Sequence, residues 1–365
     1  MKIMFTCGGT GGHIYPAIAL YEAFRKSHKH IDYLFVGSDY GLEKDIMKNE
    51  GIPIECIKSR GIKRSLSLSN IKSGICNFIA FFQAKKIISK FKPDLVISTG
   101  AYPTFHITYF ATKKEIPVFL IESNSMPGFV TRLFSNKARK VFINSKITLN
   151  YLKNQSNIEV VGIPLRIVNS HKKIEQIFKE QNLNKEEKVV TVIGGSCGSK
   201  KINECLMDII NHRELNYQII WATGKNNYSG IMEGLNKEHN KVKVMPYINN
   251  MSEILKITDL MICRAGAMTI EEIKAFAIPA ILVPFAKATD NHQHINALEL
   301  KNAGAAEILE EKNTDANMLY EKINKIITND ETLKVMKKNY ELIKSNHSKE
   351  KIVEIIWDEM RRDGC

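Results

Sequence analysis

A glycine-rich segment followed by a histidine carries the first chemical signal in the sequence. Residues 8–12 read Gly-Gly-Thr-Gly-Gly, and His13 comes next. Glycines let the backbone approach a ligand closely, and the free N–H groups of a helix beginning there favour an anion such as phosphate. A histidine beside such a loop can take a proton from a hydroxyl nucleophile. A tight turn with a structural histidine is the alternative interpretation.

A second segment of the same kind lies in the other half of the chain. Residues 194–199 read Gly-Gly-Ser-Cys-Gly-Ser, so backbone N–H groups and the Ser196 hydroxyl can bind a phosphate. Ser196 is not expected to be a nucleophile, because the G-x-S-x-G pattern is out of register. The first loop also fails the dinucleotide fingerprint, since Ile14 stands where its third glycine belongs. A nicotinamide-dependent oxidoreductase is therefore disfavoured.

Two further segments of the C-terminal half combine small, acidic and amide residues. Glu272 lies about one turn into a helix expected after Cys263, where a carboxylate can accept two hydrogen bonds from a ribose diol. A solvated helix glutamate is the alternative. Residues 290–297 bring amides and imidazoles that suit sugar hydroxyls, but His292 and His294 alone do not predict a metal site. We expect neither a metal nor another cofactor.

Short β-branched runs alternate with helical patterns along the chain and must position these segments. Such alternation predicts parallel sheets with helices on both faces. Each half begins with a strand, a glycine turn and a helix, so we predict two Rossmann-like domains facing across a cleft, with ligands at the carboxyl ends of the strands. Strands are expected at residues 2–6, 33–36, 95–98, 118–121, 141–143 and 159–161, and then at 188–193, 218–221, 241–245, 260–263 and 280–283.

Length and composition suit this architecture. The chain has 365 residues, 44% of them hydrophobic, which is enough for two cores. Its cysteines are scattered without a C-x-x-C pair, as in a reducing cytosol, and no secretory signal or membrane-spanning run is recognised.

The net charge of +13 suggests a polyanionic partner. A nucleic acid is not expected, because aromatic stacking patches and recognition motifs are missing from the sequence.

The basic excess is concentrated between Cys56 and Pro93. This stretch has nine basic residues and no acid: Lys58, Arg60, Lys63, Arg64, Lys72, Lys85, Lys86, Lys90 and Lys92. Within it, apolar residues recur at helical spacing: Ile71, Ile75, Phe78, Ile79, Phe82 and Ile87. An apolar helix face rimmed by lysines is typical of binding to an anionic membrane surface. An ordinary helix packed on the sheet is the alternative.

Taken together, these motifs resemble the peripheral membrane N-acetylglucosaminyltransferases of peptidoglycan synthesis, a family of GT-B fold. The similarity covers nearly the whole chain, through residues 8–13, 121–124, 162–166, 194–198, 247–251, 263–272 and 290–297. It implies an inverting transfer of N-acetylglucosamine from UDP-N-acetylglucosamine to the 4-hydroxyl of a lipid-linked muramoyl-pentapeptide, lipid I, at the cytoplasmic face of the cell membrane. It also implies an acceptor and membrane domain at 1–162, a donor domain at 163–342, and a helix at about 343–365 packed back on the first.

The resemblance also assigns site residues. It implies that His13 is the base, with a substrate-binding set of Thr10, Gly11, Gly12, Asn124, Arg166, Ser196, Ile248, Ala267, Met268, Thr269, Ile270, Glu271, Glu272 and Gln293. The Ile248 backbone would contact the uracil, Glu272 the ribose, and Asn124 and Gln293 the sugar. The chain departs from the common family pattern at Ile121, Ser123, Cys197, Ile163 and Ala101. The alternative is another UDP-sugar-dependent lipid glycosyltransferase of GT-B fold, for example one acting on diacylglycerol.

Overall fold

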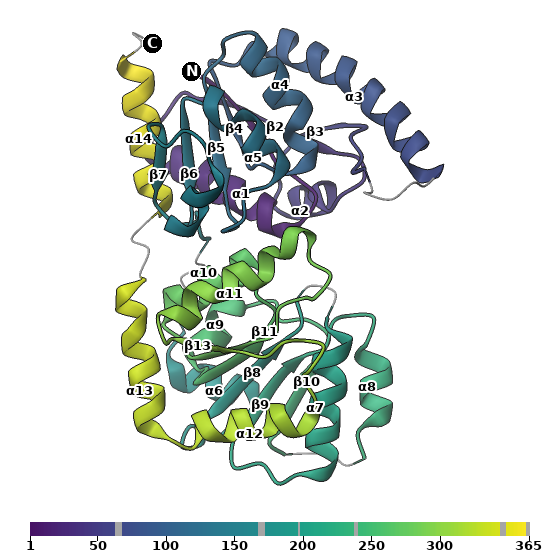
Figure 1. Ribbon diagram of the computed structural model, residues 1–365, viewed down its shortest axis with the longest axis vertical. Helices are drawn as coiled ribbons and strands as arrows, with labels where there is room; N and C mark the ends of the chain where they lie inside the picture. Colours follow the sequence, from purple (N-terminus) through teal and green to yellow (C-terminus); the bar gives the residue numbers. More distant parts are fainter. Residues whose placement is uncertain (63–67, 167–171, 196–197, 237–239, 344–347, 363–365) are drawn as a thin grey trace. The chain divides into compact units, whose positions relative to one another are not determined.

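The computed structural model describes residues 1–62, 68–166, 172–195, 198–236, 240–343 and 348–362 (Figure 1). The chain divides into two compact units. The N-terminal unit comprises Met1–Arg166 and Ser345–Cys365, and the C-terminal unit comprises Ile167–Lys344. The boundary predicted from the sequence lies between residues 162 and 163. Arg166 remains with the N-terminal unit, where its guanidinium pairs with Glu22 and Glu50.

The N-terminal unit is built on a parallel sheet with the strand order β3-β2-β1-β4-β5-β6-β7. Its strands are β1 (Lys2–Thr6), β2 (Asp32–Ser38), β3 (Ile54–Ile57), β4 (Leu95–Ser98), β5 (Val118–Glu122), β6 (Lys140–Ile143) and β7 (Ile158–Val160). Its helices are α1 (Gly11–Ser27), α2 (Glu43–Asn49), α3 (Leu68–Phe91), α4 (Phe105–Lys113), α5 (Phe129–Phe134) and α14 (Ser348–Arg362). The strand order changes direction between β1 and β4.

The C-terminal unit repeats this plan with the strand order β10-β9-β8-β11-β12-β13. Its strands are β8 (Val189–Ile193), β9 (Gln218–Ala222), β10 (Val242–Met245), β11 (Leu260–Cys263), β12 (Ala280–Leu282) and β13 (Ala306–Ile308). Its helices are α6 (Ile174–Gln181), α7 (Lys200–His212), α8 (Tyr228–Gly234), α9 (Met251–Lys256), α10 (Ala267–Phe276), α11 (His292–Asn302), α12 (Ala316–Ile327) and α13 (Asp330–Asn339). The order changes direction between β8 and β11.

Each sheet is buried on both faces, which explains the near-continuous apolar strands. Along β1, Ile3 and Phe5 belong to one core cluster, whereas Met4 belongs to the cluster on the other face. Val190 and Val192 of β8 alternate in the same way with Val189. These pairs of layers are the doubly wound arrangement expected for Rossmann-like domains, so the predicted fold class is confirmed at the level of each unit.

Helix α14 lies far from the rest of its unit in sequence but packs on α1 (Figure 1). Ile352, Val353, Ile356 and Met360 are buried in the core cluster that also contains Ile14 and Ile18. At its start, the Ser348 hydroxyl donates a hydrogen bond of 2.5 Å to the carbonyl of Ile163. The last helix therefore completes a layer of the N-terminal unit.

Candidate functional site

The predicted ligand-binding loops follow the two strands on either side of each change in strand order. In the N-terminal unit, the first glycine loop follows β1, and Thr99 to Ala101 follow β4. In the C-terminal unit, the second glycine loop follows β8, and Arg264 to Gly266 follow β11. In parallel α/β sheets, the crevice between such strands, at their carboxyl ends, is where ligands bind.

His13 spans the crevice of the N-terminal unit. Its Nδ1 lies 2.8 Å from the carbonyl oxygen of Thr99, the residue that follows β4. A carbonyl can only accept a hydrogen bond, so Nδ1 carries the proton and the neutral ring has its lone pair on Nε2. The ring is partly buried and is therefore oriented rather than freely rotating. Such an imidazole can accept a proton through Nε2.

A proline inside α1 links the first glycine loop to the turn after β5. Pro16 has no N–H, so the Gly12 carbonyl lacks its helical partner four residues on. The hydroxyl of Ser123, which is buried, lies 3.4 Å from that carbonyl oxygen and donates to it. The turn that carries Asn124 is thus connected to the loop that carries Gly11, Gly12 and His13.

The turn itself is built on the buried carboxylate of Glu122. One oxygen, Oε1, accepts from the backbone N–H of Asn124 at 2.9 Å and lies 3.4 Å from its side-chain Nδ2. The other, Oε2, accepts from the Gly128 N–H at 2.9 Å and from the Thr131 hydroxyl at 2.6 Å. Because donors occupy both oxygens, Glu122 is suited to holding Asn124 in place and poorly suited to being the base.

In the C-terminal unit, the second glycine loop turns sharply between β8 and α7. Gly195 and Gly198 have φ values of +89° and +78°. A Cβ on Gly194 would lie 2.1 Å from the backbone nitrogen of Ser199, so only glycine fits there. The Ser199 hydroxyl caps α7 by accepting from Ile202 N–H at 3.4 Å. Ser196 and Cys197, the predicted phosphate contact and the departure from the family pattern, lie outside the described residues.

The start of α10 offers backbone donors at the neighbouring strand end. Gly266 is its N-cap, and among the described side chains none caps the N–H groups of Ala267, Met268 and Thr269. These free donors and the helix dipole favour an anion. Partly buried Glu272 lies in the next turn, and burial raises its pKa from 4.5 to about 7. An ionised carboxylate in such surroundings gains from hydroxyl donors, as a ribose diol provides.

Buried ion pairs that the sequence analysis did not identify hold α10 and its loop. Lys274 Nζ lies 2.7 Å from Glu271 and 3.3 Å from Glu299 of α11, and all but Glu299 are almost fully buried. The Glu271 side chain therefore belongs to this cluster, so only its backbone is suited to a phosphate. Arg264 donates to the Val283 carbonyl at 3.1 Å and pairs with Glu311. In the sequence, these ion-paired residues show only as charged residues beside a motif, which does not predict the pairing.

The remaining predicted contacts are placed as follows. The Ile248 side chain is buried in the core, which leaves its backbone to meet a base. Gln293 Oε1 accepts from Phe285 N–H at 2.9 Å, so its amide NH₂ is the group suited to a sugar oxygen. Arg166 lies 2.9 Å from Glu22 and 2.6 Å from Glu50, and these carboxylates raise its pKa against the effect of burial. Its charge is therefore already balanced within the N-terminal unit.

Helix α3 presents large apolar side chains to solvent. Phe78 is 67% exposed, whereas Ala80, Ala84 and Ile88 on the opposite face are buried in the core. The exposed apolar stripe consists of Ile71, Ile75, Phe78, Ile79 and Phe82. Lys72, Lys85, Lys86 and Lys90 are exposed around it. Ile87, predicted on the same face, is instead partly buried against the core. Lys63 and Arg64 lie outside the described residues.

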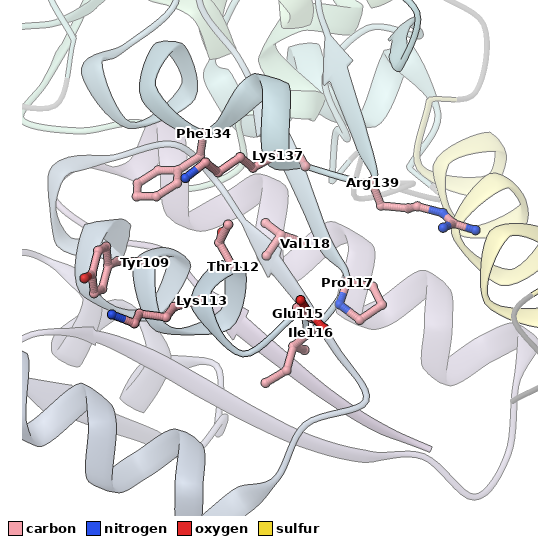
Figure 2. Close-up of a pocket in the computed structure, with 11 residues that line it drawn as sticks. Tyr109, Thr112, Lys113, Glu115, Ile116, Pro117, Val118, Phe134, Lys137 and Arg139 are labelled. Carbon is pink, nitrogen blue, oxygen red and sulfur yellow. The ribbon is translucent and has the colours of Figure 1, made fainter.

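A cavity of about 810 Å³ lies at the amino ends of strands β5 and β6 of the N-terminal sheet (Figure 2). Ile116, Pro117 and Val118 line it where β5 begins, and Lys137 and Arg139 line it just before β6. The Arg139 side chain extends away to an ion pair with Glu359 at 2.7 Å. Since the predicted ligand loops follow the carboxyl ends of the strands, this cavity is not part of the candidate site.

Within the described residues, no helix combines the length and hydropathy needed to cross a membrane. In the same part of the chain, no group of three or more His, Cys, Asp or Glu side chains is arranged to hold a metal ion. His294 Nδ1 instead lies 3.0 Å from the Glu310 carboxylate.

Comparison with protein families matches both halves of the chain to one family. Residues 3–143 match the glycosyltransferase family 28 N-terminal domain, and residues 189–355 match the glycosyltransferase family 28 C-terminal domain. Among curated proteins, the UDP-N-acetylglucosamine–N-acetylmuramyl-(pentapeptide) pyrophosphoryl-undecaprenol N-acetylglucosamine transferase of Thermoanaerobacter sp. (strain X514) is 34% identical over 365 residues, covering 98% of this chain and 99% of that protein. The protein of the same name from Ruminiclostridium cellulolyticum is 36% identical over 362 residues, with 98% and 99% covered.

Solved structures share the fold at lower identity. MurG of Acinetobacter baumannii is 24% identical, with a TM-score of 0.77 and coverage of 98% of this chain and 99% of that one. The UDP-GlcNAc 2-epimerase of Neisseria meningitidis, bound to UDP-GlcNAc, is 16% identical, with a TM-score of 0.67 and coverage of 99% and 100%. These likenesses establish a two-domain GT-B-type architecture.

Proposed function

The chain belongs to the family 28 N-acetylglucosaminyltransferases of peptidoglycan synthesis, and from this premise we propose that it makes lipid II from lipid I. It is a hexosyltransferase that moves N-acetylglucosamine from UDP-N-acetylglucosamine to undecaprenyl-pyrophosphoryl-N-acetylmuramoyl-pentapeptide. The observation that carries this proposal is the similarity to curated N-acetylglucosamine transferases of this kind, which extends over nearly the full chain and spans both units.

The C-terminal unit binds the donor in this proposal. Its second glycine loop and the α10 N-terminus follow neighbouring strands, β8 and β11, so both lie at one crevice, which suits a diphosphate. Glu272 accepts hydrogen bonds from the ribose, and the Ile248 backbone contacts the uracil. Stabilising the diphosphate makes UDP a better leaving group, because negative charge develops on it as the glycosidic bond breaks.

The N-terminal unit supplies the acceptor side and the base. The acceptor 4-hydroxyl attacks the anomeric carbon, the bond from that carbon to UDP breaks, and the hydroxyl proton passes to His13 Nε2. Attack opposite the leaving group inverts the anomeric centre. The Thr99 carbonyl supports this role, because its 2.8 Å contact fixes the proton on Nδ1 and leaves Nε2 as the acceptor.

The exposed stripe of α3 attaches the enzyme to the cytoplasmic face of the cell membrane. An apolar surface of this kind is costly in water and is typical of a membrane or protein contact. Its surrounding lysines favour anionic lipid over a neutral partner. This placement brings the N-terminal unit to the lipid-linked acceptor. We do not propose a nucleic acid as a partner.

Turnover assays test the proposed reaction directly. The enzyme is given UDP-N-acetylglucosamine, UDP-glucose or UDP-galactose together with a lipid I analogue, and separately with diacylglycerol. We expect turnover with UDP-N-acetylglucosamine and the lipid I analogue. Turnover on diacylglycerol with no activity on lipid I would instead support the alternative lipid glycosyltransferase.

A further inference from the structure

A buried carboxylate that the proposed mechanism does not use lies directly behind the first glycine loop. Glu43, at the start of α2, has no exposed surface. Its Oε1 accepts hydrogen bonds from the backbone N–H of Gly9 and from that of Ser38, both at 3.0 Å. Among the described residues, no hydrogen-bond partner lies at Oε2. The side chain thus connects the loop after β1 to the end of β2.

Three glycines make room for this carboxylate. A Cβ on Gly8 would lie 2.0 Å from Glu43 Oε1, and one on Gly41 would lie 1.8 Å from Oε2. A Cβ on Gly37 would lie 2.7 Å from Cγ of the same side chain. No side chain can be added at these positions without displacing Glu43. The pocket around the carboxylate therefore requires glycine at these three positions, just as the tight turn of a glycine loop requires glycine.

The bond to Gly9 determines how the loop is held. Gly8 and Gly9 have φ values of +151° and +85°, which only glycine adopts readily, and glycine is the most flexible residue. A charged acceptor makes a stronger hydrogen bond than a neutral one, so it holds a flexible peptide more firmly. It also directs the Gly9 N–H away from any ligand, so that donors to a substrate must come from the residues that follow.

We propose that Glu43 is a positioning residue that acts through the Gly9 N–H to hold the first glycine loop, and with it His13, in the geometry used for transfer. This inference rests on the proposed function, because it assigns the loop to the reacting site. Glu43 does not touch the substrate. Its loss should therefore affect the rate of transfer more than the affinity for the donor, whose predicted contacts lie largely in the C-terminal unit.

A comparison of Glu43→Gln with Glu43→Met separates hydrogen bonding from packing. Both replacements have similar length, but only glutamine keeps an acceptor oxygen for Gly9 and Ser38. Small displacements of reacting groups cost up to about 100-fold in rate, so we expect kcat to fall roughly 10- to 100-fold in Glu43→Met and less in Glu43→Gln. The KM for UDP-N-acetylglucosamine should change less than kcat in either variant, because only Thr10, Gly11 and Gly12 of the predicted substrate contacts lie on this loop. Equal kcat values for the two variants would overturn the inference.

Gly41→Ala provides a second test that leaves Glu43 in the sequence. Its methyl group displaces the carboxylate, so kcat should fall as in Glu43→Met. The three atoms nearest to that methyl all belong to Glu43, so in a Glu43→Ala background it should have little further effect. Gly230→Ala, where a Cβ meets nothing within 4 Å, is the matched control and should keep wild-type kcat. Wild-type kcat in Gly41→Ala, or additive losses in the double variant, would contradict the role.

These variants also separate this inference from the proposed chemistry. If His13→Ala keeps full turnover while Glu43→Met loses it, the base assignment fails and the positioning role of Glu43 stands. If His13→Ala is inactive while Glu43→Met turns over like wild type, the inference on Glu43 fails alone. If the wild-type enzyme does not glycosylate lipid I at all, the base assignment of His13 and the positioning role of Glu43 both rest on the wrong reaction.

Discussion

His13 can act as a base through only one of its ring nitrogens. Nδ1 is committed to the Thr99 carbonyl at 2.8 Å, so proton transfer must use Nε2. A positioned base contributes about 10²–10⁴-fold to the rate, and we expect His13→Ala to lower kcat by that order while donor affinity changes little. A steady-state assay and isothermal titration with UDP measure the two quantities. Weaker UDP binding with kcat unchanged would indicate a structural or phosphate-binding histidine.

The pH–rate profile provides a second measurement on the same variant. The imidazole must be neutral to accept the proton, so wild-type kcat should fall in acid. In His13→Ala the residual rate should lose that acid limb. An unchanged profile in the variant would assign the limb to another group.

Glu272 is expected to lower the stability of the folded C-terminal unit while it contributes to donor binding. Burial raises its pKa from 4.5 to about 7, so folding disfavours the ionised form. The C-terminal unit is then destabilised as pH rises through the window between these two values, by up to about 3 kcal/mol above pH 7. Glu272→Gln removes this penalty, and its thermal stability relative to wild type should be higher at pH 8 than at pH 5. Equal differences at the two pH values would show that the carboxylate is not buried in solution.

The same carboxylate makes UDP affinity depend on pH. If the ionised form accepts hydrogen bonds from the ribose, as proposed, wild-type affinity should rise as pH increases through about 7. Glu272→Gln should bind UDP more weakly above pH 7, by about 1.5–3 kcal/mol, with a flatter pH dependence. Isothermal titration at several pH values measures both.

The sequence identified residues next to recognisable motifs more readily than residues that support them. His13 and Glu272 adjoin glycine or small-residue segments, so their chemistry could be predicted from local pattern. Glu43 adjoins no motif, and its pocket is formed by the nearby Gly37 and Gly41 together with Gly8, which only the folded chain brings to it. Glu122 lies within the 121–124 motif, but only its contacts in the folded chain reveal that donors occupy both of its oxygens.

At the level of elements, α3 differs from an ordinary amphipathic helix. Its small residues Ala80 and Ala84 face the core, while Phe78 and Phe82 face solvent. Periodicity alone predicted a helix with apolar and basic residues, but it could not show which apolar face is buried. The two strands missed by the sequence analysis, β3 and β13, are short and each contains a glutamate. Their pairing with β2 and β12 stabilises them where local pattern does not.

The lysines around the α3 stripe should control attachment to anionic membranes. Attraction is about 1 kcal/mol per basic residue near the surface, so changing Lys72, Lys85, Lys86 and Lys90 together to Gln should release the enzyme from anionic vesicles at physiological salt. Activity on a short-chain soluble acceptor should survive. Vesicle co-sedimentation measures the first effect and a turnover assay the second.

A control with the same change in net charge distinguishes local from global electrostatics. Lys301, Lys325, Lys334 and Lys338 are exposed on helices of the C-terminal unit, and their change to Gln should leave vesicle binding nearly intact. If this control dissociates from vesicles as readily as the α3 variant, overall charge rather than α3 drives binding. If neither dissociates, the apolar stripe or another surface is responsible.

At the scale of the whole molecule, the two units draw on the chain differently. The C-terminal unit is one continuous segment, whereas the N-terminal unit needs the last helix from the far end of the sequence. The sequence predicted two domains from the repeated strand, glycine turn and helix. Only the family resemblance predicted that the last helix packs on the N-terminal unit, because an amphipathic pattern does not indicate the surface on which a helix packs.

The two tryptophans of the chain report on the units separately. Trp221 is buried in β9 of the C-terminal unit, and Trp357 lies on α14 beside His28, with ring centroids 3.7 Å apart and ring planes tilted by 33°. Fluorescence of Trp357→Phe therefore follows the C-terminal unit, and that of Trp221→Phe follows the N-terminal unit. UDP at about 100 times its Kd should stabilise the unit that binds it by about 2.7 kcal/mol.

With these reporters, Ile356→Ala tests whether α14 belongs to the N-terminal unit. Ile356 is fully buried in the cluster shared with α1, so its truncation should destabilise that unit by about 2–5 kcal/mol. The Trp357 transition in urea should then move to lower concentration, while the Trp221 transition and its response to UDP stay as in wild type. Because α1 carries His13, turnover should fall at temperatures where the N-terminal unit begins to unfold, although UDP still binds. If UDP moved the Trp357 transition as far as the Trp221 transition, the units would unfold as one, and α14 could not be assigned to either by stability.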